Sequence, residues 1–286
     1  MKKKISIGLI IIVTIACIFS GIQTRKQNGF HVTQIQTNLP ESLSYLIETP
    51  NHTNLMIDGG AYEDSEMLEE ILIQKGGIVD SWFITIAHSQ NFGALQKIIE
   101  NGKVQINHIY ISFNSREWYQ TYEPDRYPEI AQFLDLMYSQ SMLGKVQEIP
   151  NRFVTLIDNL YITALNVKNP EMNQTYAGFN QSMVIKVNNT YKSMIFMGNI
   201  AQTAAEQFRE NNMDEIDCDA VQISNNEQQN ISDEIYQKMT PDYLFMSVPK
   251  NGEQEEAKKY LEKIKQKVKA KQTYLSSNEP VTIKIW

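Results

Sequence analysis

The chain has 286 residues, of which 42% are hydrophobic and 21% are charged, an ordinary composition for a folded protein with one large core or two modest ones. Its 33 acidic against 26 basic side chains give a net charge of −7, which disfavours nucleic acid as a partner. Because there are only two cysteines, Cys17 and Cys218, a disulfide framework and a cysteine-based zinc site are excluded.

The first 26 residues combine a basic cap with a long apolar run. Three lysines follow Met1, and residues 5–22 contain no charge, a length typical of a signal peptide or a single membrane-spanning helix. The basic start predicts that this end stays in the cytoplasm. We expect an uncleaved anchor at the cell membrane with one domain, residues 27–286, outside the cytoplasm. A lipoprotein attached through Cys17 and a cleaved, secreted form are the alternatives.

The next hundred residues alternate between strand and helix patterns. Alternating or apolar runs predict strands at 31–35, 44–48, 55–58, 82–86 and 108–113, and helical spacing predicts helices at 67–72 and 95–101. The strand at 82–86 leads into a polar loop that begins at His88 and passes through Gly93 into the next helix. Because α/β proteins place their chemistry at the ends of such strands, His88 marks the candidate active site.

The segment 114–127 is a predicted loop with many aromatic side chains. Trp118, Tyr119, Tyr122 and Tyr127 give it either the character of a substrate rim or that of a loop packed back on its own domain. An amphipathic helix is predicted after it at 129–141, with Leu143 continuing its apolar face.

The second half begins with two predicted hairpins. The patterns place their strands at 153–157 with 160–165, and at 182–187 with 192–197. A charged helix at 253–272, rich in lysine from 263 to 271, and a final hairpin of 273–275 with 281–286 close the chain. The basic helix face is either solvated or in contact with an anionic polymer or lipid.

The order of these pieces resembles the metallo-β-lactamase superfamily. There, a strand ending in a DGG turn precedes a helix, and the next strand ends in the motif THxHxDHxGG/A. The DGG turn is matched by Asp58, Gly59 and Gly60. The second motif is matched by Thr85, Ile86, Ala87, His88, Ser89, Gln90, Asn91, Phe92, Gly93 and Ala94.

The second half resembles the branch of that superfamily typified by ComEC-type competence proteins. Its NxS strand is matched at 180–184, and its TGD turn and helix at 196–209, with Asn199 in place of the aspartate. Its DxLxVxHHGS strand is matched at 219–226, with Asn225 and Asn226 in place of the histidines, and its last Px5SV strand at 241–248. The resemblance implies a four-layer αββα sandwich of mixed α/β (α+β) type.

The resemblance also implies a degenerate metal site. In the family, histidines and aspartates hold zinc, whose bound water becomes a hydrolytic nucleophile. The matched positions here hold Ile86, His88, Gln90, Asn91, Asn199, Asn225 and Asn226. One imidazole among amides does not make a zinc site, so we expect no metal cofactor. Asp58 of the DGG turn is expected to support the loop structurally, and Glu227 is a weak candidate partner for His88 in acid-base chemistry.

Two functions therefore compete. The first is a membrane-tethered pseudo-hydrolase that binds an extracytoplasmic ligand or protein without catalysis. The second is an active ester or phosphodiester hydrolase with an atypical site, with a role in DNA uptake implied by the branch alone. Removing residues 1–26 takes away five positive charges and no negative ones, so the exported part has 21 Lys and Arg against 33 Asp and Glu, a net charge of −12. That charge makes nucleic acid an unlikely partner.

Overall fold

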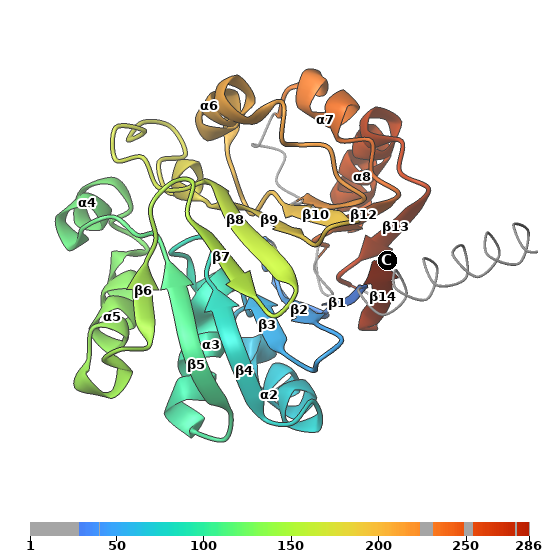
Figure 1. Ribbon diagram of the computed structural model, residues 1–286. Helices are drawn as coiled ribbons and strands as arrows, with labels where there is room; N and C mark the ends of the chain where they lie inside the picture. Colours follow the sequence, from blue (N-terminus) through green and yellow to red (C-terminus); the bar gives the residue numbers. More distant parts are fainter. Residues whose placement is uncertain (1–28, 40, 224–230, 249–253, 278, 286) are drawn as a thin grey trace, which may run out of the picture.

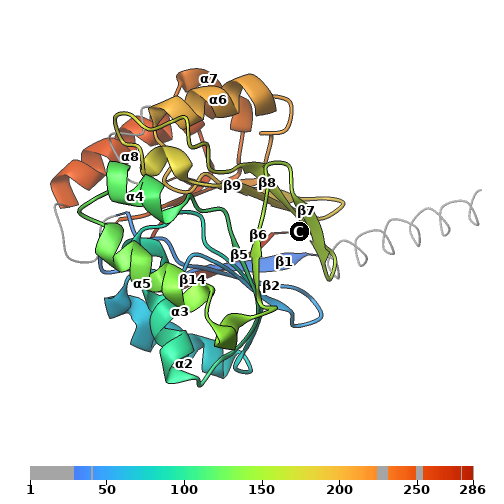
Figure 2. The same cartoon turned by 90° about the vertical axis from the view of Figure 1, so that its left-hand side faces the viewer.

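The computed structural model describes residues 29–39, 41–223, 231–248, 254–277 and 279–285. Within these residues two seven-stranded sheets lie face to face, and helices cover both outer faces (Figures 1 and 2). The first sheet has the order β14 (Val281–Ile285), β1 (Phe30–Gln34), β2 (Tyr45–Glu48), β3 (Asn54–Ile57), β4 (Ile78–Phe83), β5 (Gln105–Ile111) and β6 (Val146–Glu148). The second has the order β13 (Gln272–Leu275), β12 (Tyr243–Met246), β11 (Ala220–Ile223), β10 (Ser193–Phe196), β9 (Val184–Asn188), β8 (Leu160–Asn166) and β7 (Val154–Ile157).

Three hydrophobic layers hold these elements together. The layer between the sheets contains side chains of both, such as Tyr45, whose ring meets Phe196 edge to face at 5.3 Å. The first outer layer packs the first sheet against α2 (Ser65–Gln74), α3 (Ser89–Asn101), α4 (Arg116–Tyr122) and α5 (Tyr127–Met137). The second outer layer packs the second sheet against α6 (Gln202–Asn212), α7 (Asp233–Met239) and α8 (Gln254–Val268). The described residues thus form a four-layer αββα arrangement, as expected from the motif order.

The predicted final hairpin is wrong. β13 pairs in parallel with β12, whereas β14 crosses to the other sheet and pairs antiparallel with β1. Two alternating runs joined by a short turn resemble a hairpin locally, but each run here completes an edge of a different sheet. The chain therefore ends beside the strand with which the described part begins, and Figure 1 marks the C-terminus next to β1.

The aromatic segment 114–127 is not an open loop. Ser115 caps α4 by accepting a hydrogen bond from Trp118 N at 3.3 Å. Trp118 and Tyr119 are buried in the first outer layer and Tyr127 packs against it, whereas Tyr122 is 39% exposed, so most of the aromatic side chains are packed back on the domain. Leu143 is 78% exposed and does not continue the apolar face of α5, which ends at Met137.

The predicted membrane anchor, residues 1–26, lies outside the described residues. Among the described helices, none combines the length and the apolar character that crossing a membrane requires.

Candidate functional site

The predicted site residues gather where strands of both sheets end. Asp58 follows β3, His88 follows the buried segment after β4, and Asn199 follows β10. Two hydrogen bonds join the halves of the chain here, from Met183 N to Thr85 O at 2.7 Å and from Asn199 Nδ2 to Asn91 Oδ1 at 3.3 Å. The carboxyl ends of adjacent parallel strands thus form one edge, as α/β folds require of a site.

Asp58 lies at the centre of this edge and is fully buried. Its Oδ1 accepts from Thr85 N at 2.7 Å, and its Oδ2 accepts from Thr85 Oγ1 at 2.7 Å and from Asn91 Nδ2 at 2.9 Å. Burial raises the pKa of Asp58 to about 7, although the hydrogen bonds from Thr85 and Asn91 favour the carboxylate. The side chain joins the loop after β4 to the first turn of α3.

Asn91 and Asn199 meet directly. Both side chains are fully buried, and Asn199 Nδ2 lies 3.3 Å from Asn91 Oδ1, to which it donates. Asn199 Nδ2 also donates to Glu41 O at 2.9 Å. Because Asn91 gives its own amide hydrogen to Asp58, a chain of hydrogen bonds runs from Asn199 through Asn91 to Asp58.

His88 is held by a carboxylate that sequence patterns did not indicate. Its ring is 2% exposed, and its Nε2 lies 3.1 Å from Glu123 Oε2. Since an ionised carboxylate only accepts hydrogen bonds, the hydrogen of the imidazole lies on Nε2. Glu123 Oε1 accepts from Gly178 N at 3.1 Å, and Arg126 Nη1 lies 3.3 Å from Oε2.

The charges of this pair follow from its surroundings. Burial lowers the pKa of His88 more than the neighbouring Glu123 raises it, so the imidazole is neutral near pH 7. Burial opposes ionisation of Glu123 as well, but the hydrogen bond from His88 and the charge of Arg126 outweigh it and lower the pKa of Glu123. The pair is therefore a neutral imidazole beside an ionised carboxylate.

An apolar cluster lies beside these polar groups. Ile86, Phe179 and Ala201 are buried against one another. The ring of His88 meets Phe179 edge to face at 4.8 Å, and the guanidinium of Arg126 lies 5.5 Å from the centre of the same ring.

Comparisons with solved structures agree on one architecture. The metallo-β-lactamase fold protein YhfI from Bacillus subtilis matches with a TM-score of 0.56 and 14% identity, over 90% of this chain and all of that one. Igni18, a metallo hydrolase from Ignicoccus hospitalis, matches with a TM-score of 0.51 and 12% identity over 88% of this chain and 98% of that one. The chain has a metallo-β-lactamase fold.

The fold also occurs in larger proteins. The diiron β-hydroxylase CmlA from Streptomyces venezuelae matches 90% of this chain with a TM-score of 0.53 and 10% identity, and the match covers 54% of its own length. No protein-family model matches the chain, and no curated protein sequence does either. The comparisons therefore establish a metallo-β-lactamase fold, whereas activity must be judged from the site.

The donors at the site edge do not fit the metal that a metallo-β-lactamase fold implies. His88 uses Nε2 to bond Glu123, and the amides of Asn91 and Asn199 bond each other. Ile86 offers no lone pair. Among the described residues, no three side chains of His, Cys, Asp or Glu lie close enough together to hold a metal ion. A zinc ion prefers several imidazole, thiolate or carboxylate ligands, which this edge does not offer.

The remaining predicted site residues are less central. Gln90 is half-buried in the first turn of α3. Asn225, Asn226 and Glu227 lie outside the described residues. Sequence reasoning missed Glu123, because a glutamate among aromatic residues in an apparent loop carries no motif. The structure shows why residue 178 is a glycine: a Cβ there would lie 2.5 Å from the Glu123 carboxyl carbon, so a larger residue would displace the carboxylate.

Proposed function

We propose that this chain is a zinc-independent metallo-β-lactamase-fold domain that binds a partner instead of hydrolysing a substrate. The observation that carries the proposal is the hydrogen bond of 3.3 Å between Asn199 and Asn91, two positions at which the family places metal ligands. The neutral amide of Asn199 donates to Asn91 Oδ1 and Glu41 O without a cation, although its own Oδ1 has no hydrogen-bond partner among the described residues. A carboxylate at position 199 would instead lie near the buried Asp58, whose charge would repel it.

The surroundings of the amide pair support the same proposal. Ile86, at the position of another family ligand, packs against Phe179 and Ala201. Its side chain offers no lone pair at a position where the family has a metal ligand. We therefore propose that the motifs are degenerate in function and that the fold is retained for binding.

We propose a location outside the cytoplasm for this domain, held to the membrane by residues 1–26. The support is the basic cap and the charge-free run 5–22. The partner would then be an envelope component or a protein at the membrane's outer face. Motif order supports a relationship to the ComEC-type branch, but the net charge of −12 after residue 26 speaks against DNA as the ligand.

The buried pair of His88 and Glu123 favours a second candidate, a hydrolase that works without zinc. A neutral imidazole oriented by a carboxylate is the arrangement of a general base. It is 2% exposed, however, and a general base must reach the proton that it removes.

Turnover separates the two candidates. Full-length protein, His88→Gln and Glu123→Gln would be assayed on an activated ester and an activated phosphodiester, with and without added zinc. We expect the hydrolysis rate with the wild-type protein to equal the rates with both variants and the rate in buffer alone. A wild-type rate that either substitution lowers by about 100-fold or more would establish the hydrolase.

A further inference from the structure

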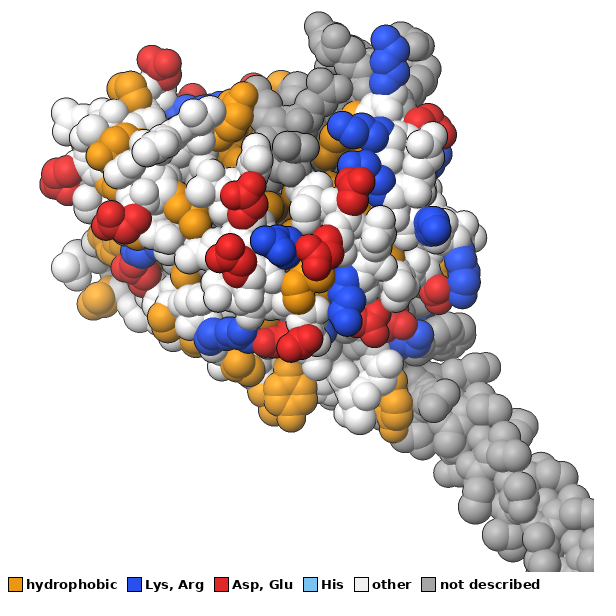
Figure 3. Space-filling model, turned by 90° about the horizontal axis from the view of Figure 1, so that it is seen from above, with side chains coloured by type: hydrophobic (Ala, Val, Ile, Leu, Met, Phe, Trp, Pro, Cys, Tyr) orange, Lys and Arg blue, Asp and Glu red, His pale blue; other side chains and the backbone are white. Residues whose placement is uncertain are grey.

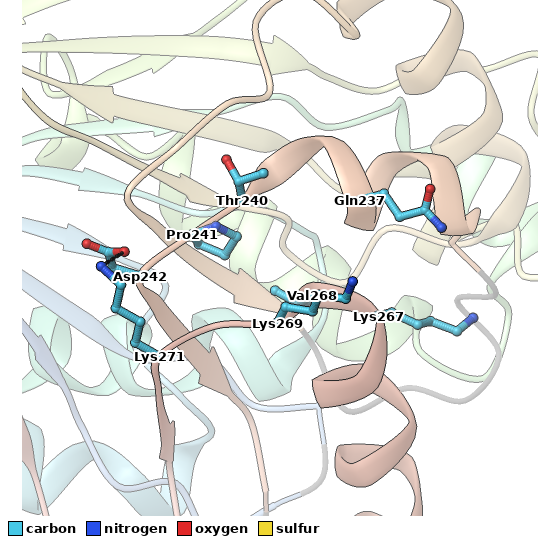
Figure 4. A pocket seen from close by; sticks show the side chains of 8 residues that line it. All are labelled: Gln237, Thr240, Pro241, Asp242, Lys267, Val268, Lys269 and Lys271. Carbon is cyan, nitrogen blue, oxygen red and sulfur yellow. Dashed lines mark ion pairs between the residues drawn. The ribbon is translucent and has the colours of Figure 1, made fainter.

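A basic pocket lies at the opposite end of the molecule from the candidate site. It has a volume of about 700 Å³ and lies between the end of α7, the end of α8 and the starts of β12 and β13 (Figure 4). It is lined by Gln237, Thr240, Pro241, Asp242, Lys267, Val268, Lys269 and Lys271. Three lysines and one aspartate give this lining a positive charge in a chain that is negative overall.

The three lysines differ in how they are paired. Lys271 lies 2.7 Å from Asp242, and the ion pair is drawn in Figure 4. Lys267 is paired with Asp233 and its ammonium lies 5.8 Å from the centre of the Tyr236 ring. Lys269 has no acidic partner among the described residues. The ammonium group of Lys269 is therefore available to an external anion.

The pocket lies at the end where the chain enters the fold. The last residue of β1, Gln34, donates through Nε2 to the carbonyl oxygen of Met246, the last residue of β12, at 3.0 Å. The two strands therefore end close together, and their first residues lie at the opposite end of the molecule. The two strands also lie at the same side of the molecule, because β14 and β1 form one edge of the first sheet and β13 and β12 form one edge of the second. The pocket and Phe30, the first residue of β1, thus lie at the same corner.

A short polar segment separates this corner from the apolar run. Residues 23–29 separate the charge-free run 5–22 from Phe30, and seven extended residues span at most about 25 Å. If the apolar run enters a bilayer, this corner lies near its surface. Figure 3 shows Lys and Arg side chains, with Asp and Glu side chains among them, on the side where Figure 1 places α8 and β13.

Exposed apolar side chains lie at the same end. Leu156 and Tyr161, beside the turn between β7 and β8, are 57% and 47% exposed, and they are opposite each other in the ladder. Tyr191, in the turn between β9 and β10, is 43% exposed. The β7–β8 turn is tied to this end through Asn51 Nδ2, which donates to Asp158 Oδ1 at 2.6 Å. Tyrosine is enriched at the interface between membrane and water.

We infer that this lysine pocket binds the phosphate of anionic lipid headgroups and so orients the domain on the membrane. The inference rests on the membrane location proposed above. A phosphate in the pocket would accept hydrogen bonds from Lys269 and from Lys271, in place of part of the latter's pairing with Asp242. The candidate site, at the other end, would then face away from the bilayer.

The test uses full-length protein in vesicles. A Gln237→Cys label carrying a fluorophore reports on the pocket, in a Cys17→Ser background, and Cys218 is buried and does not react. The vesicles contain phosphatidylcholine with a headgroup nitroxide quencher, either without or with about one quarter phosphatidylglycerol. A Gln202→Cys label at the start of α6 reports on the opposite end.

We expect quenching of the pocket label that requires phosphatidylglycerol and disappears near 1 M salt, where the Debye length is about 3 Å. Lys269→Gln with Lys271→Gln should lower the contact equilibrium about 30-fold, since each lysine near an anionic surface contributes about fivefold. The matched pair Lys263→Gln with Lys265→Gln removes the same charge from α8 outside the pocket and should retain most of the quenching.

Equal quenching of the pocket label in both lipid mixtures, or an equal loss of quenching in both double variants, would contradict lipid binding by the pocket. Resistance to alkaline extraction reports the anchor separately. If the protein is extracted but its pocket label is still quenched only with phosphatidylglycerol, the proposed anchor is refuted and lipid binding by the pocket is supported. If the protein resists extraction and the label is not quenched, the anchor is supported and lipid binding by the pocket is refuted.

Discussion

At position 199 the difference between an amide and a carboxylate decides how well the site edge tolerates the absence of a metal ion. Asn199 Nδ2 donates to Asn91 Oδ1 and Glu41 O, two acceptors that a carboxylate at position 199 could not serve. A negative charge there would be fully buried, with Asp58 one hydrogen bond beyond Asn91.

Asn199→Asp should therefore destabilise the fold by about 3–5 kcal/mol, against about 1–3 kcal/mol for Asn199→Ala. Because burial raises the pKa of such a carboxyl above its unfolded value, the loss should grow as pH rises above about 4, the ordinary pKa of aspartate. Urea unfolding of both variants at several pH values measures it. A cost equal to that of alanine, or full rescue by zinc, would mean that the edge accepts a cation.

His88 and Glu123 predict how stability depends on acid. The folded-state pKa of His88 lies below its ordinary value of 6.5, so the unfolded chain binds more protons and stability falls as pH falls below that value. The lowered pKa of Glu123 acts in the same direction at lower pH, below its ordinary value of 4.5.

His88→Gln keeps a donor for Glu123 but does not titrate, so its stability should fall less than that of the wild type between about pH 7 and pH 5.5. Unfolding free energies at these pH values test it, and parallel curves would contradict a neutral His88. From the sequence alone, His88→Ala would be expected to leave stability nearly intact. Burial and the bond to Glu123 change that expectation to a loss of about 1–3 kcal/mol.

At the scale of the elements, the first turns of α3 pack directly against the backbone of the DGG turn. Gly59 N donates to Asn91 O at 2.9 Å and Ala94 N donates to Gly60 O at 3.2 Å. Gly93 makes this approach possible, since a Cβ there would lie 2.6 Å from Tyr62 N. The clash would be with backbone, which cannot move aside as a side chain can.

Gly93→Ala should therefore cost about 1–3 kcal/mol through overpacking, even though alanine favours a helix. Lys97→Ala, on the exposed side of the same helix, is the matched control and should change stability by less than about 0.5 kcal/mol. Thermal and urea unfolding compare the two. A Gly93→Ala variant as stable as the control would show that the turn and the helix are not in rigid contact.

Most elements could be predicted from the sequence because their apolar periods are local. The strands before Asp58 and the hairpin of β7 and β8 are examples, and motif order extended this to the four layers. What could not be predicted depends on distant partners. The separation of β13 from β14 is set by pairing with β12 and β1, and the role of Glu123 is set by His88 and Gly178.

At the scale of the whole molecule, the two ends have different chemistry. The carboxyl ends of the strands carry a buried network of amides, one neutral imidazole and two carboxyl groups. The opposite end carries the chain entry, the lysine pocket and exposed tyrosines. A membrane-bound domain with these two ends would present its candidate site to partners and its basic end to lipid.

The central claim is that this metallo-β-lactamase fold is stable and functional without zinc, because amides bond each other at ligand positions. Metal content tests it most directly: full-length protein expressed with zinc, purified without chelator and measured by elemental mass spectrometry. We expect zinc far below one equivalent, with an unfolding temperature that a chelator leaves unchanged. Near-stoichiometric zinc, removed by the chelator with loss of stability, would contradict the account.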